Sequence, residues 1–354
     1  CQLVIGQFLD ALAGGGYDPH KVALMITQTG GGCRASNYIY LLRKALEKAG
    51  YGYVPVISLS MAGLEKNSGF RITLPVLRMA IAALAYGDLL MSLDNQTKPY
   101  EKQSGDSARA VARWQKKLSV MLADGKGCFV RDVRRISKQI AAEFDAIPVN
   151  PKAKLKVGIV GEIYVKYSAL GNNDLEQFLF EQGCEVCLPG ILGFAMYMAE
   201  NNVVGYKLYG GNPVIKTAAA AAGRYLYSFE CAIADATKDC KNVTYYGDFR
   251  ETRRLAESVI GLGCKMGEGW LLPGEMMELI ENGFINIVCA QPFGCLPNHI
   301  VGKGVIRRIR ELHKEANIVP IDYDPGATRV NQENRIKLML AVAREKQQEG
   351  GIGK

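Results

Sequence analysis

The sequence predicts an α/β protein that has two parallel-sheet units with added helices. Three observations indicate this class. Short, continuous apolar runs at residues 22–27 and 155–160 are typical of strands that are buried on both faces, as in a parallel sheet. Each run leads into a glycine-bearing turn and then into a segment with helical apolar spacing. Hydrophobic residues make up 48% of the 354 residues, enough for sizeable cores in two or three domains.

The first half of the chain, residues 1–150, is predicted to hold one strand–turn–helix–strand unit with a helical extension. Its expected elements are a helix at 2–13, a strand at 22–27, a helix at 37–49, a strand at 54–59, helices at 74–86, 108–122 and 130–144, and a polar loop at 95–105. The polar, proline-bearing segment 147–154 then marks a domain boundary.

The second half, residues 151–354, repeats this layout without detectable sequence identity. Its expected elements are strands at 155–160, 185–188, 285–290 and 318–322, and helices at 173–182, 190–235, 250–262, 273–282, 305–316 and 331–345, with a break near 210–213. We expect a cleft between the two domains to hold the functional site.

The overall charge and the cysteine content limit the class of protein. The net charge is +8, but Lys and Arg are scattered and no basic run has interleaved aromatic residues, which argues against nucleic-acid binding. A mild positive excess suits an anionic substrate such as a coenzyme A ester. No signal peptide opens the sequence and no apolar run looks long enough to span a bilayer, so we expect a cytoplasmic protein without a membrane partner. In a reducing compartment, ten cysteines indicate metal or redox use.

A first candidate site follows the strand at 22–27. Gly30, Gly31 and Gly32 precede Cys33, but the spacing matches neither phosphate-loop nor dinucleotide-binding fingerprints. Cys33 stands at a helix N-terminus, where the partial positive charge favours the thiolate that iron requires, and Arg34 adds positive charge. We therefore favour a metal ligand at Cys33 over its alternative, a buried structural cysteine in a tight turn.

A second candidate site follows the apolar run at 285–290. Cys289 ends the run and Cys295 lies in the turn after it, where Gly294 permits a tight bend beside something bulky. Ligands of open α/β sheets bind beyond the carboxyl ends of the strands, so both thiols are candidate metal ligands. The alternative for Cys289 is that it is the last core residue of its strand, which makes Cys295 the stronger candidate. Cys1 is a further candidate thiolate.

Carboxyl groups and one histidine stand at similar positions. Glu162 follows the strand at 155–160, and Glu268 lies between two glycines; either could act as an acid or base or bind a substrate. Helix capping explains Glu162 equally well. His299, four residues past Cys295, is a candidate proton donor, with a half-exposed loop histidine as the alternative. Asp322 ends the last strand and points toward the same cleft.

Several stretches together resemble one family. They are QTGGGCRASNY (28–38), VGIVGEIYVKY (157–167), MGEGWLL (266–272), CAQPFGCLPNHI (289–300) and IDYDPGATRVNQENRIKLML (321–340). They resemble the bacterial acyl-CoA dehydratase activase-related proteins, relatives of the 2-hydroxyacyl-CoA dehydratases and of the double-cubane cluster proteins. The resemblance extends over nearly the whole chain.

The resemblance implies two flavodoxin-like domains with helical additions and an iron–sulfur cluster, [4Fe-4S] or a larger double-cubane type, held between them by cysteines at strand ends. Cys33 matches the first-domain cysteine, and Cys289 or Cys295 the second-domain one. The family's early cysteine lies just before the first helix, about where Cys1 stands. An ATP-hydrolysing activator would deliver low-potential electrons, and a homodimer or heterodimer is compatible with this organisation. The dehydratase substrate pocket is not recognisable here, so no particular acyl-CoA is implied.

The resulting hypothesis is an enzyme, reductase or dehydratase-like, that uses an iron–sulfur cluster to reduce or dehydrate a small substrate or acyl-CoA. Two alternatives come from other classes. One is a cluster-free regulatory or scaffold module that docks an activator ATPase. The other is a nucleotide- or CoA-binding protein whose glycine turn at 30–32 binds the anion.

Overall fold

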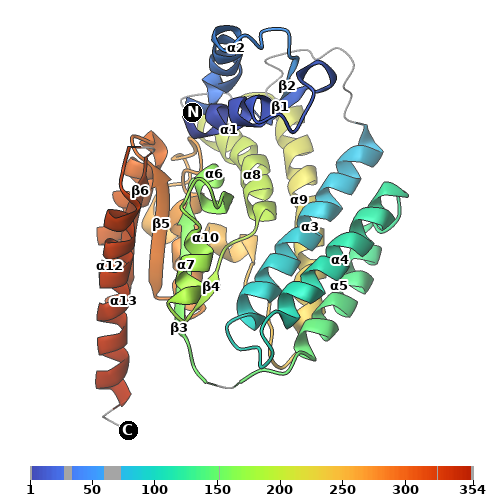
Figure 1. Ribbon diagram of the computed structural model, residues 1–354. Helices are drawn as coiled ribbons and strands as arrows, with labels where there is room; N and C mark the ends of the chain where they lie inside the picture. The colour runs from blue at the N-terminus through green and yellow to red at the C-terminus, as the bar shows by residue number, and fades with distance from the viewer. Residues whose placement is uncertain (1, 28–33, 60–72, 151, 325, 352–354) are drawn as a thin grey trace.

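The structure, a computed structural model, describes residues 2–27, 34–59, 73–150, 152–324 and 326–351. Within these ranges the chain is a mixed α/β protein with two sheets, one of two strands and one of four, and every strand pairing in them is parallel (Figure 1). The predicted fold class, α/β with parallel sheets and added helices, is confirmed.

The four-stranded sheet belongs to the second half of the chain. Its strands are β3 (Leu155–Gly161), β4 (Cys184–Cys187), β5 (Asn286–Pro292) and β6 (Asn317–Tyr323). Their order across the sheet is β4-β3-β5-β6, which is the order 2-1-3-4 typical of doubly wound, flavodoxin-like sheets. The strand order reverses between β3 and β5, so the expected ligand site lies beyond the carboxyl ends of these two strands.

Helices cover both faces of this sheet, which explains why its strands are continuous apolar runs. One face packs against α6 (Ile163–Tyr167), α7 (Leu175–Glu181) and α13 (Arg329–Gly351), and the other against α10 (Phe249–Val259), α11 (Leu271–Glu281) and α12 (Ile306–Leu312). Val288 faces the first core, and Ile287 and Cys289 face the second. Each fully buried side chain of this size contributes about 1.5–3 kcal/mol.

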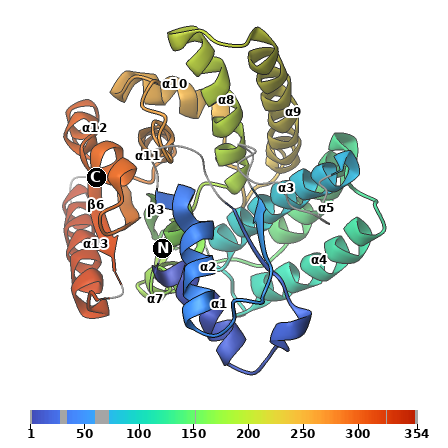
Figure 2. The same cartoon turned by 90° about the horizontal axis from the view of Figure 1, so that it is seen from above.

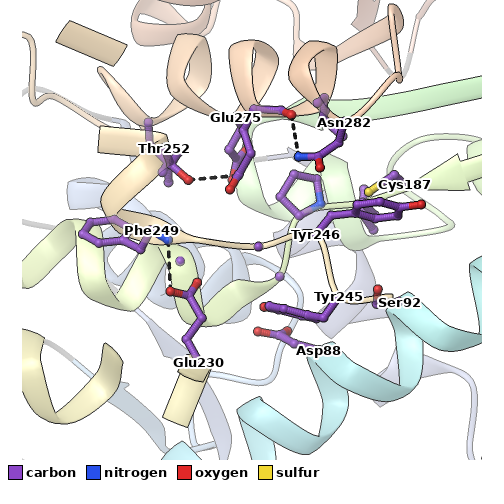
Figure 3. A pocket seen from close by; sticks show the side chains of 18 residues that line it. Asp88, Ser92, Cys187, Glu230, Tyr245, Tyr246, Phe249, Thr252, Glu275 and Asn282 are labelled. Atoms are coloured by element: carbon purple, nitrogen blue, oxygen red, sulfur yellow. Dashed lines mark hydrogen bonds between the residues drawn. The ribbon is translucent and has the colours of Figure 1, made fainter. Parts of the chain in front are cut away.

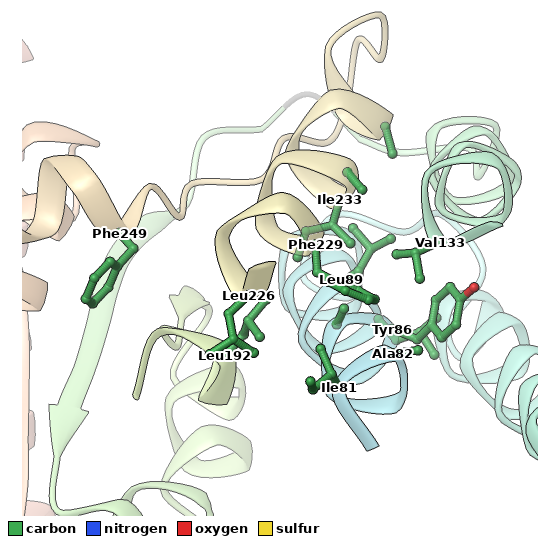
Figure 4. Close-up of a cluster of buried hydrophobic side chains, with 14 of the residues drawn as sticks. Ile81, Ala82, Tyr86, Leu89, Val133, Leu192, Leu226, Phe229, Ile233 and Phe249 are labelled. Atoms are coloured by element: carbon green, nitrogen blue, oxygen red, sulfur yellow. The ribbon is translucent and has the colours of Figure 1, made fainter. Parts of the chain in front are cut away.

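A helical bundle packs beside the sheet, on the side opposite α12 and α13 (Figures 1 and 2). Its helices are α3 (Leu74–Thr97), α4 (Asp106–Ala123), α5 (Val130–Asp145), α8 (Ile191–Tyr209) and α9 (Pro213–Thr237). Leu89 of α3, Val133 of α5 and Phe229 of α9 share one core (Figure 4). The chain leaves the bundle at the segment predicted as a domain boundary, 147–154, and later returns to it through α8 and α9.

The N-terminal unit forms a separate small core around the two-stranded sheet. It contains α1 (Gln2–Ala13), the 3₁₀ helices Pro19–Lys21 and Arg34–Asn37, β1 (Leu24–Thr27), α2 (Tyr38–Lys48) and β2 (Val56–Leu59). The Tyr164 hydroxyl of α6 donates to Gln7 Oε1 of α1 at 2.7 Å. α1 therefore lies against the end of the large sheet where β3 finishes.

Two expectations about α3 are wrong. The helix continues to Thr97, past the predicted end at residue 86 and into the predicted loop, because Gln96 is buried and donates to the Thr244 carbonyl at 2.7 Å. We also expected no apolar run long enough to span a bilayer, but α3 is long and apolar enough for one by length and composition. It is a core helix of the bundle: Leu89 and Leu93 are fully buried, and Asp88 accepts hydrogen bonds from the start of α8.

The short helices beside the sheet edge were not predicted from the sequence, and some helix ends were misplaced. α6 and a π-helical turn, η3 (Asn298–Lys303), were not predicted. α12 ends at Leu312 rather than at residue 316, because His313 adopts an extended conformation and the chain then turns toward β6. The predicted break at residues 210–213 between α8 and α9 is confirmed.

Candidate functional site

The candidate site lies where β3 and β5 end, at the point where the strand order reverses. We define it by Glu162, Glu268, Cys295, Asn298 and His299. Glu162 directly follows β3, the turn that carries Cys295 follows β5, and Glu268 lies in the loop between α10 and α11. Three segments that are far apart in the sequence thus meet at one edge of the sheet.

Gly161 allows β3 to approach β5 closely enough to place Glu162 at this edge. Its φ is +148°, and a Cβ there would lie 1.8 Å from the Ala290 carbonyl oxygen. The Glu162 amide donates to the same oxygen at 3.0 Å. Glu162 Oε2 then accepts from the Val165 amide at 2.9 Å, so the carboxyl group caps α6. Burial raises the pKa of Glu162.

Glu268 is held in a buried position by the glycines on either side of it. Gly267 and Gly269 have φ of +58° and +42°, and a Cβ at Gly267 would lie 2.8 Å from Pro297 Cγ. Glu268 Oε1 accepts from the Ile163 amide at 3.3 Å and its Oε2 from Asn298 Nδ2 at 3.2 Å. Burial, and secondly the nearby Glu162 charge, raise the pKa of Glu268 to about 7. The group is therefore suited to exchanging a proton near neutral pH.

Cys295 lies in a tight turn whose geometry depends on the glycine before it. Gly294 has φ of +73°, and the Cys295 amide donates to the Pro292 carbonyl at 3.1 Å. Asn298 Nδ2 lies 3.3 Å from Cys295 Sγ and donates to it. Burial raises the pKa of the Cys295 thiol to about 11, and the charge of Glu268 adds to this although Asn298 opposes it. A bound cation would be needed to deprotonate this thiol at neutral pH.

Cys289 lies in a different environment from Cys295. It is fully buried in the apolar core between β5, α11 and η3, and a Cβ at Gly302 would be 3.2 Å from its Sγ. Burial raises the pKa of the Cys289 thiol to about 12. This environment matches the alternative reading of Cys289, in which it is the last core residue of its strand.

His299 orients the turn through both ring nitrogens. Nδ1 lies 2.9 Å from the Cys295 carbonyl oxygen, which can only accept, so Nδ1 carries the proton. Nε2 lies 3.2 Å from Lys303 Nζ, which can only donate, so Nε2 is an acceptor. The Nδ1–H group therefore helps to hold the turn that carries Cys295.

Lys303 links the turn to the end of β6. Its Nζ donates to Asp322 Oδ2 at 2.7 Å, and Gln291 Nε2 donates to Asp322 Oδ1 at 2.7 Å. Burial alone would raise the pKa of Asp322, but these hydrogen bonds and the Lys303 charge hold it below its usual value. Asp322 therefore lies at the predicted edge and is engaged in a structural network.

The amide side chains at this edge were not among the site residues predicted from the sequence. Gln291 and Asn298 are both fully buried, and Gln291 Oε1 and Asn298 Oδ1 have no hydrogen-bond partner among the described atoms. Each amide has its NH₂ group directed at a carboxylate, which fixes the free oxygen as the acceptor. The signal was present in the sequence, because two amides stand in an otherwise apolar and proline-rich stretch at a strand end.

Some candidate residues lie outside the described residues: Cys1, Gly30, Gly31, Gly32 and Cys33. In the ranges that the structure describes, no group of three or more His, Cys, Asp or Glu side chains is assembled to hold a metal ion. At the end of β5, the Cys295 thiol is a candidate metal ligand among the described residues, and the Asn298 amide donates a hydrogen bond to its sulfur.

Comparison with known proteins gives no match: no protein-family model, curated protein or solved structure matches this chain.

Proposed function

We propose that this chain is an iron–sulfur protein that works as the 2-hydroxyacyl-CoA dehydratase superfamily does. It receives low-potential electrons from an ATP-hydrolysing activator and uses them to reduce, or to dehydrate by a radical route, a small substrate or acyl-CoA. The observation that carries the proposal is the position of Cys295. Its thiol lies at the strand-order reversal with an N–H donor directed at the sulfur, and such hydrogen bonds tune the potential of cysteine-ligated clusters.

The cluster would be held by Cys295 from the second domain and by Cys33 and Cys1 from the first. When bound, it supplies one-electron chemistry at low potential. The fit is supported by the donor chemistry at the end of β5 and by the free buried oxygens of Gln291 and Asn298, which would accept hydrogen bonds from a substrate.

The carboxyl groups of this chain would manage protons beside that centre. Glu268, with a pKa of about 7, can hold or release a proton near neutral pH. Burial and, secondly, the Glu162 charge keep that pKa high, and His299 holds the Cys295 turn in place. None of these roles depends on which substrate binds.

The surface around the turn supports a protein partner. Phe293, Leu296 and Ile300 are 66%, 61% and 58% exposed, and they flank Cys295 in the sequence. Large apolar side chains that are exposed close together along the chain suit a site of protein–protein contact. An activator that delivers electrons would have to approach this edge.

The test is anaerobic reconstitution with iron and sulfide, followed by metal analysis and electron paramagnetic resonance. We expect the parent to bind iron and sulfide, and Cys295→Ala and Cys33→Ala to lose most of both. Cys264→Ala is the matched control, because Cys264 is an exposed thiol and should not affect iron content. A parent that binds no iron would overturn the proposal and favour the cluster-free regulatory or scaffold module.

A further inference from the structure

A second polar region lies away from the strand edge, inside the molecule. A cavity of about 50 Å³ separates the bundle from α10, α11 and the end of β4 (Figure 3). Carboxyl groups from three helices line it: Asp88 from α3, Glu230 from α9, and Glu275 and Glu278 from α11. The proposed function uses none of them.

The negative charge of this region is only partly balanced. Lys166 Nζ lies 3.1 Å from Glu275 Oε1, and this pair is buried. Within the described ranges, no salt bridge reaches Asp88, Glu230 or Glu278. Asp88 is instead fixed as the cap of α8, where it accepts from the Ile191 and Leu192 amides.

Glu230 and Glu278 hold the beginning of α10 from two sides. Glu230 Oε2 accepts from the Phe249 amide at 3.0 Å, as the dashed line in Figure 3 shows. Glu278 Oε1 accepts from the Asp248 amide at 2.8 Å. These contacts connect α9 and α11 through the first turn of α10.

The two contacts of Thr252 are each satisfied by a full hydrogen bond when Glu278 carries a proton. Thr252 Oγ1 lies 2.9 Å from the Asp248 carbonyl oxygen and 2.9 Å from Glu278 Oε2. A hydroxyl has one hydrogen and a carbonyl oxygen can only accept, so Thr252 cannot make a full hydrogen bond to both as the donor. Both contacts are satisfied when Thr252 donates to the Asp248 carbonyl and protonated Glu278 donates to Thr252 Oγ1.

The electrostatic surroundings agree with this assignment. Burial raises the pKa of Glu230 to about 8, and the charges of Asp248 and Asp88 add to it while the Phe249 amide opposes it. Burial likewise raises the pKa of Glu278 to about 8, with added effects from Glu230 and Glu275.

The other groups that face this region are tyrosines and a thiol, which are neutral below about pH 9 because burial raises their pKa values above the usual ones. They are Tyr245 and Tyr246 before α10 and Cys187 at the end of β4, which line the cavity, and Tyr167 at the end of α6, which feels the charges of Glu275 and Asp88. They therefore provide no compensating charge when the carboxyl groups ionise.

We propose that this cavity is a proton-dependent latch. The neutral carboxyl groups of Glu230 and Glu278 hold the beginning of α10 against the bundle. Their ionisation releases it, because unpaired negative charges buried beside Asp88 outweigh the backbone N–H donors that an ionised carboxylate would favour. The loop that carries Glu268 connects α10 to α11, so release of α10 loosens the candidate site as well. The latch itself does not depend on a bound cluster.

Hydrogen exchange followed by mass spectrometry tests the latch on the full chain between pH 6.5 and 9. The measured quantity is the protection factor of the backbone amides in the peptide 245–259, corrected for the intrinsic exchange rate. We expect it to fall about tenfold per pH unit for each proton that the two carboxyl groups release. Glu230→Gln and Glu278→Gln should each reduce this slope, and the double variant should remove it. The side-chain amide that Glu278→Gln introduces can still donate to Thr252 Oγ1, so the neutral network is kept.

Glu281→Gln is the control, because Glu281 is an exposed residue of the same helix and should leave the slope unchanged. Protection that does not change with pH in the parent, or that falls equally in the double variant, would overturn the latch.

If the variants do not fold, infrared spectroscopy of the parent decides. The carbonyl band of protonated carboxyl groups must be present at pH 7 and lost by pH 9.5, and its absence at pH 7 would overturn the proposal.

Discussion

Lys166 Nζ lies 3.1 and 3.2 Å from the two carboxylate oxygens of Glu275, and both side chains are buried. Lys166 belongs to α6, the helix that Glu162 caps, and Glu275 belongs to α11, which follows the Glu268 loop. The ion pair therefore joins the two segments that carry the carboxyl groups of the candidate site.

Breaking this pair from one side should be strongly destabilising. Lys166→Met leaves the Glu275 carboxylate buried without its cation, so we expect a loss of about 3–5 kcal/mol in the free energy of unfolding. The double variant Lys166→Met/Glu275→Leu removes both charges and should recover most of this loss. Urea denaturation at pH 7 measures both, and equal stabilities of the single and double variants would contradict the assignment.

Gly161 should tolerate no side chain. A Cβ would lie 1.8 Å from the backbone oxygen of Ala290, which cannot move without separating β3 from β5. We expect Gly161→Ala to cost at least about 3 kcal/mol. Gly183→Ala is the matched control: Gly183 has φ of +77° but open space around it, so its cost should be about 1 kcal/mol. Thermal melts of both variants separate steric overlap from backbone strain.

The strands of the large sheet could be predicted from the sequence because both faces are buried. Every residue of β5 from Asn286 to Gln291 is buried, which gives a run without alternation. The turn chemistry around Gly294 also located the carboxyl end of this strand to within two residues, at Pro292 instead of residue 290.

Other features depend on contacts that the sequence does not show. The length of α3 is set by tertiary contacts, such as the hydrogen bond between Gln96 and the Thr244 carbonyl. The role of Asn298 depends on the approach of the Glu268 loop, and the carboxyl cavity depends on α3, α9 and α11 coming together. Residues that are far apart in the sequence meet there, and no local pattern records this.

Glu268 should make the stability of the protein depend on pH. Its pKa rises from 4.5 to about 7 on folding, so the folded state binds this proton more tightly than the unfolded chain. The resulting stabilisation is present below about pH 4.5 and is lost as the pH rises through 7. We expect the parent to lose about 2–3 kcal/mol from this group between pH 5 and 8.5.

Glu268→Gln should reduce that pH dependence by the same amount. The comparison uses urea midpoints at both pH values for the parent, the variant and Glu345→Gln. Glu345 is an exposed residue of α13, and its substitution should leave the slope unchanged. A slope that is identical in the parent and in Glu268→Gln would show that Glu268 is ionised in the folded protein at pH 5.

The Asn298 amide should control the acidity of Cys295. Its N–H stabilises the thiolate at 3.3 Å, so removing it should raise the pKa of this thiol by on the order of one unit. The measurement is the pH dependence of iodoacetamide alkylation at Cys295, followed by mass spectrometry in the apoprotein. The midpoint is the readout because the absolute rate also reflects access.

Asn298→Ala should move this midpoint upward, and Asn298→Asp should move it further because a carboxylate repels the developing charge. Alkylation of the exposed Cys264 in the same samples provides the internal reference and should not change. A midpoint that is unchanged in Asn298→Asp would mean that the amide does not interact with the sulfur. The assignment of Cys295 as a metal ligand would then lose the support of this hydrogen bond.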